Sequence, residues 1–342
     1  MHRLEIDNPR WVDFVLASEV ATPFHHPAWA TLLGDCYRYS AFALALDDAE
    51  GRIAAGLPVL DVTNRLTGKR WVSLPYTDAC PPLIGSRGSM EELVAGLEEE
   101  RRRGGIPQLE CRAELAGSPV RPRTEAVIHT LPTGPDLEQM ERGLKRSVRQ
   151  HIAKGRRSGV TVRRAETLEE LADTFYALHV RTRKRQGVPV QPRGYFVRLW
   201  QRILEPGLGF CLLAESGDRP IAGAVFLAWK NTVVYKYSAS DHRYLGLRPN
   251  YVLLWEAICW SGANGYETLD FGRTDLDHSG LRHFKSSWGA REESLVYSTL
   301  GEASGGGQGL SSRGAPLLSP VIRHSPPGVC RAIGELLYRY AA

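Results

Sequence analysis

The stretch LDFGRTDLDHSGLRHFKSSWGA, residues 269–290, contains the side chains best suited to chemistry in this sequence. Within it, His283, Phe284 and Lys285 follow one another. Lysine is rare in this chain, which has 7 Lys and 36 Arg among its 43 Lys and Arg residues. These three residues are therefore the best candidates for chemistry. A simple ion pair with an acid such as Asp270 is the alternative explanation for Lys285.

Other catalytic signatures are missing from the sequence. It has no GxSxG, HExxH or P-loop motif, so no nucleophile stands out. The cysteines are widely scattered and form no CxxC pair; they are Cys36, Cys80, Cys111, Cys211, Cys259 and Cys330. Such spacing favours buried, reduced thiols over disulfides or a structural zinc site. We therefore expect a reaction that uses no metal and no bound cofactor.

The composition indicates a folded protein with room for two domains. The chain has 342 residues, of which 43% are hydrophobic and 24% are charged, enough to build substantial cores. A net charge of +5 permits an anionic partner without requiring one. The first residues contain no apolar leader, and no segment is apolar over the roughly 18 residues that a membrane span needs. We therefore expect a cytoplasmic protein.

Residues 145–157, KRSVRQHIAKGRR, form a basic cluster. Helical spacing can place several of the cations on one face, and such a face can hold the phosphates of a tRNA. The candidate phosphate-binding residues are Lys145, Arg146, Arg149, Lys154 and Arg157. A solvated helix surface is the alternative. A second basic cluster, RTRKRQG at 181–187, ends a predicted helix, where cations also suit the helix dipole.

The stretch RYLGLR, residues 243–248, bears on the acyl donor. Enzymes that bind acyl-coenzyme A hold its pyrophosphate with backbone N–H groups of a glycine-rich turn that begins a helix. Their usual spacing calls for a small residue where this chain has Arg248, and the following Pro249 has no N–H to donate. The pattern therefore counts against coenzyme A.

Two hairpin patterns indicate a duplicated α/β unit. Residues 42–60 and 209–228 each place two apolar runs around a polar turn. In both cases a helical stretch precedes the hairpin and another strand follows it, and RIAAG aligns with RPIAG. Residues 117–136 are rich in Pro, Gly and Thr, which suggests a boundary. We predict an α/β (α+β) protein with two tandem domains, residues 1–135 and 136–300.

Helical periodicity in the second domain covers residues 137–158, 167–186, 194–204 and 250–264. Asp136 can cap the first of these helices. The last, NYVLLWEAICWSGANG, is apolar nearly all round, which predicts a buried helix.

Beyond the second domain the sequence changes character. Residues 301–316 are rich in Gly and Ser and predict a flexible linker. Residues 317–342 predict a C-terminal helix with apolar side chains on one face. We expect this helix to pack on the first domain; peripheral contact with a membrane surface is the alternative.

Several pieces of the sequence resemble FemAB-like (FemX-like) transferases. They are LPYTDACPPLI at 74–84, RQHIAKGRRSGV at 149–160, RTRKRQG at 181–187, DFGR at 270–273 and FKSSWG at 284–289. The resemblance covers roughly residues 20–300. Proteins of that family have a tandem GNAT fold and transfer an amino acid from aminoacyl-tRNA to an amine of a peptidoglycan precursor. The resemblance therefore implies the same two-domain fold for this chain.

The resemblance also implies roles for individual residues. Lys285 is similar to the family lysine that is thought to stabilise the oxyanion formed when the acceptor amine attacks the acyl ester. Arg185 resembles a contact to a phosphate of the acceptor. The stretch YKYSASDHRYLGLRPNYV at 235–252 is similar to the family as well. Together with the other similar regions it supplies the remaining candidate substrate-binding residues, which are Phe284, Arg273, Tyr237, Asp78, Tyr76, Asn250 and Trp288. The family's second basic phosphate contact, near its N-terminus, has no clear counterpart in this sequence.

Together these observations predict an aminoacyltransferase that forms an amide bond. Its expected partners are aminoacyl-tRNA, as co-substrate, and an amine of a peptidoglycan precursor or of a peptide-like or antibiotic compound. We expect it to work as a monomer. One alternative is an acyl-coenzyme A-dependent N-acyltransferase of the same fold. Another is a non-catalytic protein of envelope or exopolysaccharide assembly.

Overall fold

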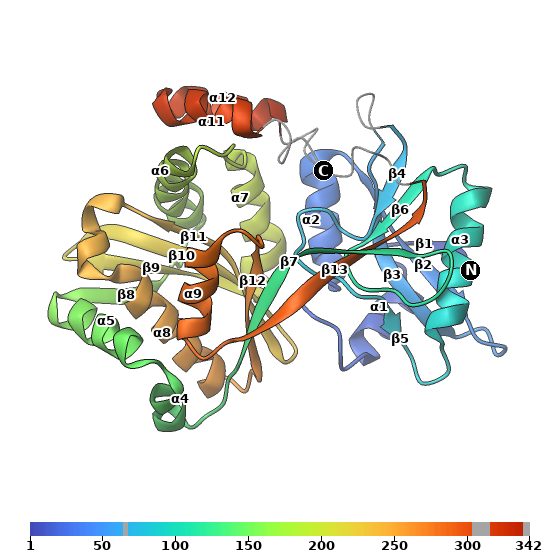
Figure 1. The fold of residues 1–342 in the computed structure, drawn as a ribbon, viewed down its shortest axis with the longest axis horizontal. Coiled ribbons are helices and arrows are strands. Elements are labelled where there is room, and N and C mark those ends of the chain that lie inside the picture. The colour runs from blue at the N-terminus through green and yellow to red at the C-terminus, as the bar shows by residue number, and fades with distance from the viewer. Residues whose placement is uncertain (64–67, 303–314, 338–342) are drawn as a thin grey trace. The chain divides into compact units, whose positions relative to one another are not determined.

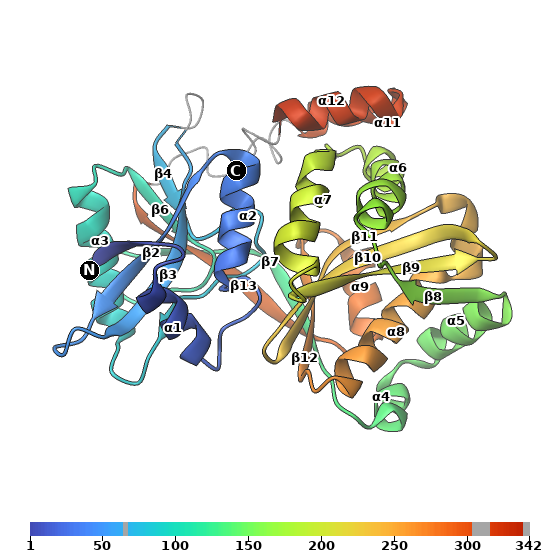
Figure 2. The same ribbon diagram turned by 180° about the vertical axis from the view of Figure 1, so that it is seen from behind.

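A computed structural model describes residues 1–63, 68–302 and 315–337 of the chain. The described residues divide into two compact units. Unit 1 contains residues 1–126 and the chain from residue 294 to the end of its last strand. Unit 2 contains residues 127–293 and the C-terminal helices. The ribbon is drawn from two sides in Figures 1 and 2.

Unit 1 is a twisted sheet with helices. Its strands in spatial order are β1 (His2–Glu5), β2 (Ser40–Asp47), β3 (Ile53–Asp61), β4 (Arg70–Val72), β6 (Gln108–Cys111) and β13 (Arg291–Gly301), with β5 (Leu83–Ile84) beside β3. Its helices are α1 (Pro9–Ala17), α2 (Pro27–Tyr37) and α3 (Met90–Arg103). Apolar side chains of β2, β3 and α3 form one core. The predicted hairpin at residues 42–60 is confirmed as β2 and β3.

Unit 2 has its own set of sheet strands. Its strands in spatial order are β7 (Arg121–Pro132), β12 (Thr268–Thr274), β11 (Thr232–Ser240), β10 (Arg219–Trp229), β9 (Gly209–Ser216) and β8 (Val160–Arg164). Its helical segments are α4 (Leu137–Gly143), α5 (Arg146–Arg157), η1 (Glu170–Phe175), α6 (Tyr176–Gln186), α7 (Arg193–Leu199), η2 (Trp200–Leu204), η3 (His242–Leu247), α8 (Pro249–Ala263) and α9 (Ser279–Ser287). Helices α6 and α7 cover one face of this sheet, and α5 and α8 lie on the other (Figures 1 and 2).

The two sets of strands repeat one topology. Each has an antiparallel hairpin, β2–β3 or β9–β10, followed by a strand that pairs in parallel with a later one. The parallel pairs are β4 with β6 and β11 with β12, and a helix connects the two strands of each pair. The predicted tandem α/β architecture is therefore confirmed. The repetition extends beyond the single hairpin match that the sequence displays.

Each unit contains part of a strand that the sequence prediction gave to the other domain, so the boundaries of the units differ from those predicted. Residues 127–132 of β7 belong to unit 2, where they pair with β12. In return, β13 pairs with β6, so that residues 294–301 belong to unit 1. The predicted division at residue 135 misses this exchange, because hydrophobic alternation identifies a strand but not the neighbour with which it pairs.

The C-terminal tail also differs from the prediction. It forms two helices, α11 (Ala315–His324) and α12 (Pro327–Leu337), instead of the single helix predicted over 317–342. Both lie against α6 in unit 2, as Figures 1 and 2 show, and not on the first domain. Glycines permit the close approach: a Cβ at Gly187 would lie 2.1 Å from Ser319 Oγ, and one at Gly334 would lie 2.0 Å from Val190 O. Most of the predicted linker, 301–316, lies outside the described residues.

Within the described parts of the chain, the model contains no helix with the length and apolar character that crossing a bilayer requires.

Candidate active site around Lys285

Lys285 is the best candidate for chemistry in unit 2. It lies in the last turn of α9, and its side chain is buried, with the residue only 4% exposed. Its Nζ donates hydrogen bonds to the carbonyl oxygens of Gly272, at 2.7 Å, and Arg273, at 3.1 Å. The helix ends at Ser287, and Gly289 then adopts a positive φ of 83°, which lets the chain turn into β13. The rare lysine thus contacts the backbone of β12.

A bulge in β12 turns these carbonyl groups toward the ammonium. The pairing of β12 with β7 shifts register between Asp270 and Arg273. Gly272, inside the bulge, has a φ of 70°, a conformation that glycine adopts at least cost. Its N–H donates to Asp270 Oδ1 at 2.6 Å. Asp270 therefore shapes the bulge that faces Lys285.

The site lies at the point where the parallel pairing of β11 with β12 ends. The parallel pairing of β11 with β12 runs from Thr232 and Thr268 to Val234 and Asp270. Gly272 and Arg273 lie two and three residues beyond Asp270 in β12. Backbone groups beyond such a point are not used by the ladder, so they are available to ligands and side chains.

His129 on β7 is a second polar group of this site, and the sequence analysis missed it. The residue is fully buried, and its Nε2 lies 3.0 Å from Oε2 of Glu292. Burial and then the nearby charge of Lys285 lower the pKa of His129, while Glu292 opposes the shift. Arg282 on α9 donates to both carboxylate oxygens of Glu292, at 2.6 and 3.0 Å. The signal that could have found His129 is its position inside the apolar strand pattern AVIHTL.

Of two predicted substrate-binding residues, Trp288 lies in the core of unit 2 and Phe284, partly buried, packs against it. Trp288 is fully buried, and its ring stacks on Tyr251 of α8 with a centroid distance of 5.8 Å. Phe284 packs edge-on against Tyr251, at 5.5 Å, and against Trp288, at 6.1 Å. We therefore assign Trp288 to packing and not to substrate contact. Together the rings anchor α9 against α8 and so fix the position of Lys285.

Three other predicted residues lie on β11 or β12 or contact β11. Arg185 of α6 donates to the carbonyl oxygen of Ser240, at 3.3 Å, and Tyr237 exchanges a hydrogen bond of 2.8 Å with Tyr195. Arg273 pairs with Asp275 at 2.9 Å. The carbonyl oxygen of Arg273 also accepts the hydrogen bond from Lys285, so this predicted residue belongs to the site.

Asn250, Tyr76 and Asp78 lie elsewhere in the two units. Asn250 is at the start of α8 and is partly buried. Tyr76 and Asp78 belong to unit 1, in the loop after β4. The ring of Tyr76 lies 4.5 Å from that of Tyr37, and the carbonyl oxygen of Asp78 accepts a hydrogen bond of 2.7 Å from Tyr297.

The predicted basic helix is α5, and its cations point to solvent. The candidates Lys145, Arg146, Arg149, Lys154 and Arg157 are all exposed. The opposite face carries Val148 and Ile152, which are buried in the core of unit 2. Gly155 brings α5 close to α8, since a Cβ there would lie 2.4 Å from Val252 Cγ2. One face of α5 therefore packs while the other presents positive charge.

The RYLGLR stretch forms a closed turn. Residues His242–Leu247 make the 3-10 helix η3, and Arg248 has a φ of 60°. The N–H of Arg248 donates to Leu245 O, and those of Tyr251 and Val252 donate to Arg248 O. Because these donors are used within the turn and Pro249 has none, the start of α8 is a poor cradle for a pyrophosphate.

Asp241 holds this turn in place. Its carboxylate accepts hydrogen bonds from the guanidinium of Arg243, the shortest at 2.6 Å, and from Arg181 at 3.2 Å. The contacts from Arg243 hold the pKa of Asp241 well below its usual range.

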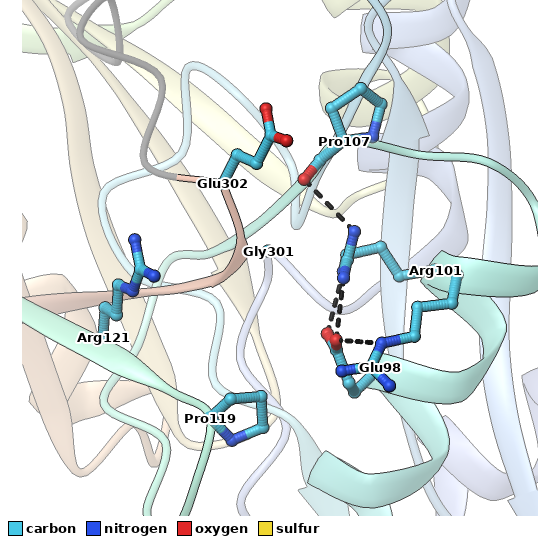
Figure 3. Close-up of a pocket in the computed structure, with 8 residues that line it drawn as sticks. Glu98, Arg101, Pro107, Pro119, Arg121, Gly301 and Glu302 are labelled. Atoms are coloured by element: carbon cyan, nitrogen blue, oxygen red, sulfur yellow. Dashed lines mark hydrogen bonds and ion pairs between the residues drawn. The ribbon is translucent and has the colours of Figure 1, made fainter.

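A separate hollow in unit 1, drawn in Figure 3, does not form a comparable site. Its volume is about 330 Å³, and α3 supplies part of its lining. Figure 3 shows Glu98 and Arg101 facing each other, with a contact of 2.7 Å, and Arg101 reaching the carbonyl oxygen of Pro107 at 3.2 Å. These charges satisfy one another. Within the described residues, no group of three or more His, Cys, Asp or Glu side chains could hold a metal ion.

Comparison with known proteins shows what the second unit is similar to. Residues 142–286 match the family model described as an acetyltransferase (GNAT) domain. That span includes α5, the RYLGLR turn and Lys285. Most of unit 2 therefore matches a GNAT domain. Comparison with curated protein sequences found no match.

Solved structures extend the similarity to most of the chain. FemX is 15% identical, with a TM-score of 0.69 over 87% of this chain and 97% of that one. L-PGS from Bacillus licheniformis is 12% identical, with a TM-score of 0.59 over 94% and 99% of the two chains. A tandem GNAT protein from the clavulanic acid biosynthesis pathway is 10% identical, with a TM-score of 0.52 over 88% and 98%. The chain therefore has a FemX-like tandem GNAT fold.

Proposed function

We propose that this protein transfers an aminoacyl group from aminoacyl-tRNA to an amine, forming an amide bond. The observation that carries the proposal is the buried ammonium of Lys285, which donates to the β12 bulge inside a GNAT acyltransferase domain. The FemX-like fold supports the choice of donor, because FemX-like enzymes are the family that the sequence motifs resemble.

Lys285 is the group that we assign to the oxyanion. When an amine attacks the acyl ester, the carbonyl oxygen gains negative charge, and a positioned cation in a dry site stabilises it. We infer that the developing oxyanion takes the place of the longer of the two contacts, that with Arg273 O at 3.1 Å. The contact with Gly272 O would then keep the ammonium in position. Binding the two reactants side by side supplies the remaining acceleration.

Two features, α5 and the RYLGLR turn, support aminoacyl-tRNA as the proposed donor of the aminoacyl group. The exposed cations of α5 suit the phosphates of an RNA, and each phosphate contact releases condensed counterions. The turn before α8 uses its N–H groups internally, which counts against coenzyme A. No bound cofactor is needed for attack of an amine on an activated ester.

Acyl-coenzyme A is the alternative donor. The description of the matching family model, an acetyltransferase domain, favours it. The two proposals share the fold and the role of Lys285, and they differ only in the donor.

A transfer assay separates them. The full-length chain would be incubated with total aminoacyl-tRNA carrying radiolabelled amino acids and with a panel of amines that includes peptidoglycan precursors. A parallel reaction would contain labelled acetyl-coenzyme A. Label that moves from tRNA to an amine supports the proposal. Transfer from acetyl-coenzyme A alone would replace it with the alternative.

A further inference from the structure

A hollow in unit 2 lies apart from the Lys285 site. Its volume is about 230 Å³. It is formed where the end of β8 and the start of β9 meet η2 and the last turn of α8. The side chains that matter for its chemistry are Arg164, Trp200, Phe210, Trp260 and Tyr266. None of the lining residues belongs to the site described above.

Arg164 brings a positive charge into this hollow. The Cζ of its guanidinium lies over two rings, 4.5 Å from the centroid of Phe210 and 4.6 Å from that of Trp260. Such stacking occupies the face of the guanidinium and leaves the N–H groups at its edge. Among the residues that the structure describes, no side chain or carbonyl accepts a hydrogen bond from Arg164, and no acid pairs with it.

Arg163, the neighbouring arginine, differs from Arg164 because acids pair with it. Arg163 pairs with Glu170 at 2.6 Å and with Glu215 at 3.0 Å. Burial lowers the pKa of Arg164, opposed only by Tyr266, whereas the pKa of Arg163 is raised. Arg164 is exposed to solvent and, within the described residues, has no acid beside it, so its guanidinium could pair with a bound anion.

The walls of the hollow suit a flat ring. Trp200, Trp260 and Tyr266 are all partly exposed, and the rings of Trp260 and Tyr266 are 5.3 Å apart. Nucleobases of every kind can stack on aromatic side chains and on guanidinium planes. The space is sufficient for one base but not for several.

We propose that this hollow binds one nucleotide, with the base among the aromatic side chains and the phosphate on Arg164. The choice of a nucleotide over other aromatic anions rests on the proposed function, in which the donor is an RNA. The same chemistry is presented by a free mononucleotide and by an unstacked nucleotide of an RNA strand. The experiment is designed to tell these sources apart.

The test measures binding by calorimetry to the full-length chain. The probes are AMP, adenosine, inorganic phosphate and the single-stranded oligonucleotide 5′-phospho-CCA. We expect AMP or the oligonucleotide to bind, adenosine to bind more weakly and phosphate weakest. Binding of the oligonucleotide alone assigns the hollow to RNA, and binding of AMP alone assigns it to a free nucleotide.

Variants connect the binding to the hollow. Arg164→Gln and Trp200→Leu should each weaken binding by about 10-fold, the loss typical of a stacking or phosphate contact. Arg163→Gln is the matched control and should bind as the wild type does. The proposal is overturned if no nucleotide probe binds to the wild type. It is also overturned if Arg164→Gln and Trp200→Leu bind the probes as tightly as the wild type does.

The outcome is independent of the transfer reaction. If the wild type transfers aminoacyl groups but no nucleotide probe binds, this inference alone fails. If nucleotides bind through Arg164 but no transfer from tRNA occurs, the proposed function alone fails.

Discussion

The ammonium of Lys285 donates a 2.7 Å hydrogen bond to the carbonyl oxygen of Gly272, the residue that gives the β12 bulge its positive φ. This contact joins α9 to the strand at the point where the parallel ladder of β11 and β12 ends. The position of the cation therefore depends on a backbone conformation that few residues other than glycine adopt.

Gly272→Ala should strain the bulge. A φ of 70° is unfavourable for alanine, so we expect a loss of about 1–2 kcal/mol in the free energy of unfolding. The same change should displace the carbonyl group that holds Lys285 and lower turnover. Urea unfolding and the transfer assay measure the two effects.

Gly280→Ala is the control for this experiment. Gly280 lies in α9, and an added Cβ there meets no atom within 4 Å. Alanine also favours the helix, so stability should stay equal or rise slightly. A Gly272→Ala protein as stable as the Gly280→Ala protein would contradict the account of the bulge.

Much of the fold follows from local patterns. The helix predicted over 250–264 is α8, Pro249–Ala263, and the apolar sequence on all its sides matches its burial. The helix predicted over 137–158 is divided into α4 and α5, since Leu144 at the C-cap of α4 has extended backbone and Lys145 then caps α5. Both hairpins were recognised because each places a polar turn between two apolar runs.

The rest of the fold depends on contacts that periodicity cannot encode. Strands β7 and β13 look like ordinary strands, and only their long-range pairing reveals the exchange. The tail was predicted to dock on the wrong unit, because an apolar helix face does not specify its partner surface.

The candidate site shows the same limit. The rarity of lysine and the resemblance of the surrounding motif to a known family are enough to predict Lys285 from the sequence. The burial of Trp288 and the contribution of His129 depend on packing, which the sequence pattern does not give. A histidine in an apolar strand is usually a core residue, so His129 gave little reason for notice.

His179 should make stability depend on pH. It is buried against Phe175 and Phe196, and its Nε2 lies 2.8 Å from Gln191 Oε1. Burial lowers the pKa of His179 from 6.5 to about 3. Below pH 6.5 the unfolded chain therefore binds a proton that the folded chain excludes, so stability falls as pH falls toward 3. The slope from this group is at most about 1.4 kcal/mol per pH unit.

The measurement compares urea unfolding at pH 7 and pH 5. The His179→Gln variant should lose about 2 kcal/mol less than the wild type over this interval. The control, His242→Gln, changes a histidine whose side chain is 68% exposed, and it should behave as the wild type does. Identical pH dependence in the wild type and His179→Gln would contradict the assignment.

The exposed cations of α5 should contribute to RNA binding through charge. We expect the affinity for tRNA to fall linearly with the logarithm of the salt concentration. The double variant Arg146→Gln/Arg149→Gln should reduce the magnitude of this slope by about 1–2. Filter binding at several salt concentrations gives the slope.

The matched control removes two exposed cations elsewhere. Arg102→Gln/Arg103→Gln changes α3 in unit 1, where these arginines pair with Glu98 and Glu100. This double variant should keep the wild-type slope. Equal slopes in all three proteins would place RNA binding away from α5.

The central claim is that the charge of Lys285 acts on the reaction. Its most direct test is the transfer assay with Lys285→Met, which keeps the length of the side chain and removes the ammonium. Turnover should fall by about 10²–10³, as for loss of one oxyanion donor, while the KM for the acceptor amine changes little. Lys230→Met, on the turn between β10 and β11, is the control and should retain full activity. A Lys285→Met protein that is folded, with a melting temperature near that of the wild type, and still transfers at the normal rate would contradict the account.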